Sequence, residues 1–167
     1  MKLRKVFDLF ALSLAIVLYP IATLAGSTSG TIKGHLTFQA DGPCGAGYSA
    51  YCPSGSCLCY VFAGTISGSP IGNGQAQVQA TIDYGAALSS GRTCFPVFAE
   101  LDLDTKRDVE TVNAVGSACN TSGPVDKLAG GFGIADSERG AQGSGSVSGT
   151  FNLSTGKLVV DYSGATF

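Results

Sequence analysis

Apolar and polar residues alternate with a period of two along most of the chain. In the segment 30–39, Ile32, Leu36 and Phe38 fall on one side, while lysine, histidine and threonine side chains fall on the other. Such alternation is typical of half-buried β-strands, and short strands separated by glycine-rich turns are typical of antiparallel sandwiches and barrels. The pattern therefore predicts an all-β fold. The segments that carry it are 30–39, 59–68, 74–85, 94–104, 109–119, 146–153 and 158–164.

The C-terminal segment 143–167 consists mainly of glycine, serine and threonine. All 24 glycines of the chain follow residue 25, and glycine-rich composition is also found in disordered regions. We favour an ordered structure, because the few apolar residues of this segment keep the two-residue period. We expect a hairpin with strands at 146–153 and 158–164 and a turn at 154–157.

The first 25 residues have the three-part layout of a secretory signal peptide. Three basic residues are followed by an apolar run at 9–18, and the small residues Thr23 and Ala25 precede an expected cleavage site. The competing interpretation is an uncleaved membrane anchor, but the run is shorter than the ~20 residues that a spanning helix needs. We therefore expect a signal peptide at 1–25 and one secreted domain at 26–167, extracellular or periplasmic.

The charge of the mature chain excludes some partners. Of 10 basic and 12 acidic residues, 7 and 11 remain after cleavage, so the formal charge changes from −2 to −4. Nucleic-acid binding requires clustered positive charge, and no run of lysine and arginine follows residue 25. We therefore expect no nucleic-acid partner. No further apolar span follows, so we expect no stable membrane insertion after cleavage; the oligomeric state stays open.

Two of the six cysteines are predicted to pair across a hairpin. An even number of cysteines in a secreted chain points to disulfide bonds. The midpoint between Cys94 and Cys119 falls between Lys106 and Arg107, within the polar turn at 104–108, so the two cysteines should face each other across neighbouring strands. We predict a disulfide between Cys94 and Cys119.

The other four cysteines lie close together in the sequence, at Cys44, Cys52, Cys57 and Cys59. Cys57 and Cys59 stand at the expected start of a strand, and we expect them to point to opposite sides and not to pair. Two pairings remain open: Cys44–Cys57 with Cys52–Cys59, or Cys44–Cys59 with Cys52–Cys57. Zinc is the alternative to disulfides here, but the two CxxC knuckles usual for a four-cysteine zinc site are absent.

No motif for catalysis or cofactor binding is present in the sequence. His35 is the only histidine, and it falls on the polar side of the segment 30–39, where a surface position is expected. The chain has no GxSxG or HExxH motif, and the glycine-rich stretch 143–149 is not followed by a helix that could present amide groups to a phosphate. We assign no catalytic, metal-binding or cofactor-binding residue and predict no cofactor.

Acidic residues gather around the turn at 104–108. Calcium prefers such oxygen ligands, but the spacing departs from an EF-hand loop, because Lys106 occupies the fifth position and no glycine follows at the sixth. The other interpretation is a solvated hairpin tip whose charges discourage aggregation between strand edges. Calcium binding stays open. The residues concerned are Glu100, Asp102, Asp104, Asp108 and Glu110; Glu138 and Arg139, in a later turn, are candidates for lining a barrel mouth.

Several segments resemble a family of small secreted bacterial β-barrel proteins of unknown function. The resemblance is carried by CLCYVFAGT, CFPVFAE, GSACNT and GGFGIADSERGAQGSGSVSGTFN, which cover 57–65, 94–100, 116–121 and 130–152. The last of these is similar to the glycine-rich turn of allene oxide cyclase-like and dirigent-like proteins. Those are eight-stranded antiparallel barrels with a central cavity, so the resemblance implies a single barrel of about eight strands, with a β-sandwich as the alternative.

The same resemblance makes Gly140, Gly143 and Gly145 structural glycines of the turn. The chain departs from the family at Glu138, where the family has an aromatic residue, and we carry over no catalytic or substrate-binding residue from either barrel family. Two functions follow as expectations. The first is a non-enzymatic barrel that binds a small apolar ligand or serves as a cell-surface or extracellular component. The second is a cofactor-free isomerase or cyclase of the allene oxide cyclase type, which moulds an apolar substrate in its cavity.

Overall fold

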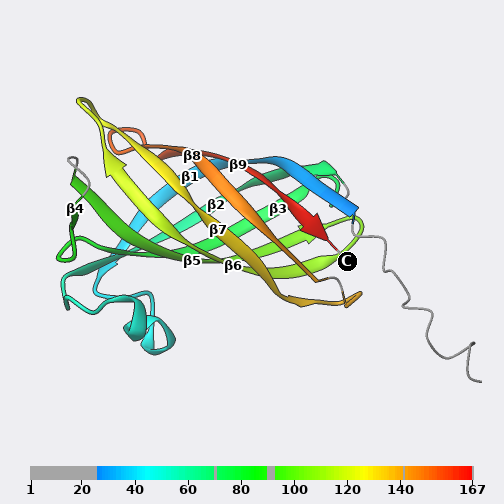
Figure 1. Ribbon diagram of the computed structural model, residues 1–167, viewed down its shortest axis with the longest axis horizontal. Coiled ribbons are helices and arrows are strands. Elements are labelled where there is room, and N and C mark those ends of the chain that lie inside the picture. Colours follow the sequence, from blue (N-terminus) through cyan, green and yellow to red (C-terminus); the bar gives the residue numbers. More distant parts are fainter. Residues whose placement is uncertain (1–25, 70, 90–92, 141, 167) are drawn as a thin grey trace, which may run out of the picture.

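A computed structural model describes residues 26–69, 71–89, 93–140 and 142–166 (Figure 1). The expected signal peptide at 1–25 lies outside the described residues. The described chain is nearly all strand, with one short 3-10 helix. The elements are β1 (Gly26–Asp41), η1 (Ala46–Tyr51), β2 (Cys57–Ser69), β3 (Gly74–Asp83), β4 (Leu88–Ser89), β5 (Thr93–Thr105), β6 (Val109–Asn120), β7 (Val125–Ser137), β8 (Gly143–Asn152) and β9 (Lys157–Thr166).

The strands form a closed antiparallel barrel. They follow the order β3-β2-β1-β9-β8-β7-β6-β5, and pairing of β3 with β5 closes the ring. The two-residue strand β4 pairs with the start of β5 outside this ring. The predicted single barrel of about eight strands is therefore confirmed, and the sandwich alternative is wrong. Closure removes the free sheet edges that would otherwise be open to pairing with other chains.

The glycine-rich C-terminal segment forms the predicted hairpin. β8 and β9 pair from Gly143 opposite Thr166 to Phe151 opposite Leu158. Both strands are longer than the sequence pattern indicated, because serine and glycine continue the backbone ladder beyond the apolar positions. β9 also pairs along its length with β1, so the first and last strands of the barrel are neighbours.

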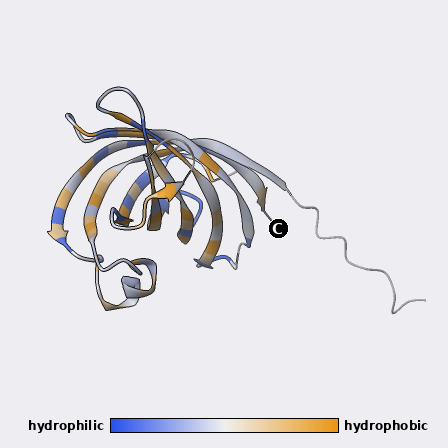
Figure 2. Cartoon of the chain, turned by 60° about the vertical axis from the view of Figure 1, so that its left-hand side comes forward, coloured by the Kyte–Doolittle hydropathy of each residue, from blue (hydrophilic) through white to orange (hydrophobic). Residues whose placement is uncertain are grey.

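Side chains alternate between the inside and the outside of the barrel, as the two-residue period predicts. Ile32 lies opposite Ile66 in β2 and Val160 in β9, and these inward residues belong to one apolar core. The intervening positions carry polar residues such as Gln77 and Lys33, which are exposed. Figure 2 shows the resulting succession of apolar and polar positions along the strands.

Pairs of glycines inside the barrel make room for aromatic rings. Gly30 lies directly opposite Gly68 in β2, and a Cβ at either position would overlap the Tyr162 hydroxyl oxygen. Gly34 and Gly64 form a second pair beneath the Phe62 ring. The Tyr162 and Phe62 side chains can therefore pack directly against the backbones of β1 and β2, because glycine has no Cβ that would block them. Further inward pairs are Gly116 with Gly130 and Gly145 with Gly164.

Three disulfide bonds stabilise the fold and fit an oxidising environment. Cys94 pairs with Cys119 as predicted. Of the two pairings left open, the structure has Cys44–Cys59 and Cys52–Cys57. The expectation that Cys57 and Cys59 point to opposite sides is wrong. Residues two apart on a strand share a face, and both cysteines lie on the outer face of β2, each turned to a different partner in the preceding loop.

The loop at 42–56, which carries η1, covers the outer faces of β3 and β5. The Cys44 backbone N–H donates a hydrogen bond to Thr81 Oγ1 at 3.0 Å. Tyr51 stacks on Phe98 of β5 with ring centroids 3.6 Å apart. Consequently Thr81 and Asp83, which point away from the barrel interior, are fully buried.

Candidate functional site

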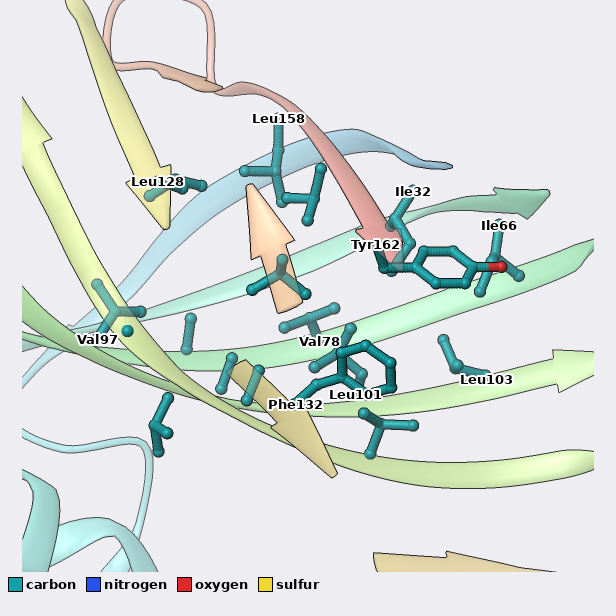
Figure 3. A pocket seen from close by; sticks show the side chains of 18 of the residues that line it. Ile32, Ile66, Val78, Val97, Leu101, Leu103, Leu128, Phe132, Leu158 and Tyr162 are labelled. Carbon is teal, nitrogen blue, oxygen red and sulfur yellow. The ribbon is translucent and has the colours of Figure 1, made fainter. Parts of the chain in front are cut away.

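The barrel contains a cavity of about 130 Å³ that is lined almost entirely by apolar side chains. Every strand of the ring contributes, because the inward positions of each carry aliphatic or aromatic residues. Figure 3 shows Ile32, Val78, Leu101 and Phe132 pointing into this space from four different strands. Apolar cavities of roughly 150 Å³ bind molecules the size of benzene. The space therefore fits an apolar ligand of about six to eight non-hydrogen atoms.

The two ends of the cavity region differ, and we name them by a buried acid at each. The Glu110 end contains the starts of β1, β3, β6 and β8 together with the ends of their partner strands. The Asp126 end is the opposite one, where β7 begins beside the end of β6. Glu110 lines the cavity, whereas Asp126 lies beyond its lining.

Glu110 is a buried carboxyl inside an apolar barrel. It occupies an inward position of β6, opposite Leu103 of β5, and is 6 % exposed. Its Oε2 atom has no hydrogen-bond partner. Burial raises the pKa of Glu110, and the nearby charge of Asp108 raises it further. Both effects disfavour the carboxylate, so the side chain is suited to acting as a neutral hydrogen-bonding group.

Two hydroxyl groups also line the cavity at the Glu110 end. Thr28 in β1 is 2 % exposed, and its Oγ1 atom has no hydrogen-bond partner. Tyr162 in β9 reaches across Gly30 and Gly68, and its hydroxyl donates a long hydrogen bond of 3.5 Å to the Ser67 carbonyl. Burial raises the pKa of Tyr162, and the charge of Glu110 adds to this effect, which places the two groups within electrostatic reach.

Polar groups also meet at the Asp126 end. Asp126 is 2 % exposed, its Oδ1 atom has no hydrogen-bond partner, and burial raises its pKa. Burial raises the pKa of Tyr84, and contact with Tyr60 and the charge of Asp126 add to the shift. Tyr60 in turn packs edge-on against Phe151, whose side chain lines the cavity. An aromatic layer thus separates Asp126 from the cavity.

The acidic residues around the turn at 104–108 are not gathered into one site. Alternation along β5 places Asp102 and Asp104 on the outer face, while Glu110 lies inside the barrel. The barrel wall therefore separates them. Asp108 accepts a hydrogen bond from the Ser137 hydroxyl at 2.5 Å. Among the described residues, no three His, Cys, Asp or Glu side chains lie close enough together to hold a metal ion.

The remaining sequence candidates lie outside the cavity. His35 is exposed on the outer face of β1, and Glu138 and Arg139 are exposed in the turn before β8. Gly140 in that turn has φ +71°, and a Cβ there would meet open space. Gly145 has a different role, because a Cβ would overlap the Ser163 carbonyl oxygen of β9. Gly143 pairs with Thr166 at the start of β8.

Sequence reasoning missed the polar groups at both ends of the barrel. The sequence pattern suggests Glu110 as a calcium ligand or as a charge at a solvated hairpin tip, and the second interpretation is wrong for Glu110 because its side chain is buried. The sequence pattern does not single out Thr28 or Asp126. The available signal was the register: Glu110 takes the same side of its strand as Val112 and Ala114. An acidic residue on the face of a strand whose other residues are apolar indicates a buried acid.

No protein-family model matches this chain, and no curated protein or solved structure matches it either. Within the part of the chain that the structure describes, no helix is long and apolar enough to cross a membrane.

Proposed function

We propose that this protein is a secreted, disulfide-stabilised barrel that binds a small apolar molecule in its interior without transforming it. The cavity of about 130 Å³ carries this proposal, because its lining is formed by aliphatic and aromatic side chains from every strand of the ring. Ligand sites in β-barrels are concave, largely apolar and preformed. The three disulfides support export, since such bonds persist in oxidising compartments.

A cavity-filling variant tests the binding proposal. Ala99 lines the cavity opposite Ala114 of β6, so Ala99→Leu would place three additional carbon atoms in the space. Ala63→Leu is the matched control, because Ala63 is exposed on the outer face of β2. Isothermal titration with benzene and toluene measures the affinity of each variant. We expect binding to the wild type and to Ala63→Leu, and at least tenfold weaker binding to Ala99→Leu.

Two results would overturn the proposal. The first is wild-type protein that binds neither probe and releases no small molecule into an organic extract analysed by mass spectrometry. The second is Ala99→Leu protein that keeps the wild-type affinity. Export has its own test, because N-terminal sequencing of exported protein should return Gly26, and a sequence beginning at Met1 would exclude cleavage.

A cofactor-free isomerase or cyclase is the second candidate, and Glu110 is the observation in its favour. Burial raises the pKa of this carboxyl inside an apolar cavity, as is usual for catalytic acids and bases. The test compares the molecules that wild-type and Glu110→Gln protein release into an organic extract. If the two molecules are isomers of each other, the result would favour catalysis. The same molecule in both extracts would favour binding alone.

A further inference from the structure

Two buried polar atoms at the Glu110 end of the cavity lack partners within the protein. They are Oε2 of Glu110 and Oγ1 of Thr28, and both residues are more than nine-tenths buried. Both residues also belong to the lining of the cavity, so a molecule bound there lies against their side chains. Buried polar groups are almost always hydrogen-bonded, so these two atoms call for a partner from outside the protein, such as a bound molecule or an ordered water.

We propose that the natural ligand carries a hydroxyl group, which sits against Glu110 at the end of the cavity that Thr28 also lines, while its hydrocarbon part lies among the aliphatic side chains. This inference rests on the proposed binding function and names the class of ligand: a small neutral alcohol. The cavity volume of about 130 Å³ limits the ligand to the size of hexanol or benzyl alcohol.

The chemistry of the two orphaned groups favours a hydroxyl over other head groups. A neutral carboxyl both donates and accepts a hydrogen bond, and an alcohol does the same, so one hydroxyl satisfies both functions of Glu110. Thr28 adds a second hydroxyl at this end. The Tyr162 proton is already directed to the Ser67 carbonyl, which leaves the Tyr162 oxygen as an acceptor.

Charged head groups fit this end less well. A ligand carboxylate would lie against the carboxyl group of Glu110, within reach of the negative charge of Asp108. An ammonium group would need Glu110 ionised, and the remainder of the lining is apolar and offers poor solvation to a buried charge. An alcohol requires neither change.

Three probes of matched size test the head group by isothermal titration. Hexan-1-ol and 1-methoxypentane are isomers, and only the alcohol can donate a hydrogen bond; hexylammonium is the charged counterpart. We expect hexan-1-ol to bind the wild type at least tenfold more tightly than either of the others. Glu110→Met keeps the length of the side chain and should reduce that preference to less than threefold. Thr28→Val should reduce it partially.

Glu138→Met is the matched control, because Glu138 is an exposed acid at the same end of the barrel. It should keep the full preference for the alcohol. Circular dichroism melting of each variant separates loss of binding from loss of fold. Should Glu110→Met fail to fold, the wild-type comparison of the two isomers still decides the question.

The outcomes distinguish this inference from the function on which it rests. Equal affinity for hexan-1-ol and 1-methoxypentane would overturn the hydroxyl assignment and leave apolar binding intact. Tightest binding of hexylammonium would overturn it in favour of an amine. Failure of all three probes, together with benzene and toluene, and an organic extract that contains no small molecule would overturn the proposed function itself.

Discussion

Cys94 and Cys119 lie directly opposite each other in β5 and β6, with Cα atoms 3.9 Å apart. Their disulfide closes a loop with a sequence separation of 25, compared with 15 for Cys44–Cys59 and 5 for Cys52–Cys57. In the chain-entropy model, a loop of that length stabilises the folded state by about 3–4 kcal/mol. The Cys94→Ser/Cys119→Ser variant should therefore lose more stability than removal of either other bridge.

Guanidinium unfolding of the three double variants measures this order. Peptide mapping without reduction should return Cys94 and Cys119 in one linked peptide pair. A variant lacking Cys52 and Cys57 that proved the least stable of the three would contradict the loop-length argument.

Close contact between β8 and β9 makes Gly145 intolerant of a side chain. A Cβ there would overlap the Ser163 carbonyl oxygen and the Gly164 Cα, and backbone atoms cannot rotate away. Gly145→Ala should destabilise the protein by about 1–3 kcal/mol, as overpacking typically does. Gly123→Ala is the control, because a Cβ at Gly123 would meet open space, and its effect should stay within about 0.5 kcal/mol. Thermal unfolding followed by circular dichroism compares them.

The backbone conformation of Gly140 in the turn before β8 leads to a separate prediction about stability. This residue has φ +71°, a backbone conformation that a β-branched residue adopts only with strain. Gly140→Val should lower the melting temperature although nothing surrounds the new side chain. An unchanged melting temperature would show that the turn relaxes to another conformation.

Glu110 makes the stability of the barrel depend on pH. Its folded-state pKa is raised by burial and by Asp108, above the ordinary value of 4.5. The neutral form is therefore favoured by folding, and its stabilising contribution is present below pH 4.5 and is lost as pH rises through the folded-state pKa. Glu110→Gln should flatten this decline. Urea unfolding between pH 4 and 8 measures it, and parallel curves for the two proteins would exclude the effect.

Asp83 should have the opposite dependence. Burial alone would raise its pKa, but hydrogen bonds from the side chain and backbone of Ser54 and from the backbone N–H groups of Gly85 and Ala86 outweigh burial and lower the pKa below 3.8. Its contribution is present above pH 3.8 and is lost as pH falls through the folded-state pKa. Ser54→Ala should reduce stability at pH 6 by about 1–2 kcal/mol and by less at pH 2. A loss independent of pH would contradict this assignment.

The architecture can be read from the sequence because the alternation at Ile32 and Leu36 reports which face of the strand points into the barrel. Phe38 continues the pattern but is half exposed near the end of β1. The Cys94–Cys119 pair followed from counting to the turn between them. The pairing of Cys44 and Cys52 could not be derived, since it depends on how the loop at 42–56 folds back onto β3. The burial of Glu110 could be predicted, because it shares one face of its strand with apolar residues. The burial of Thr28 could not be predicted, because threonine is common on both faces of a strand.

Pairing of β1 with β9 has a consequence for the order of folding. Gly26 lies opposite Thr166, so contacts between the beginning and the end of the domain complete the ring. The barrel cannot close until its last strand has been synthesised, and contacts of such large sequence separation form slowly. During synthesis the chain must therefore remain an unclosed sheet or an unfolded polypeptide.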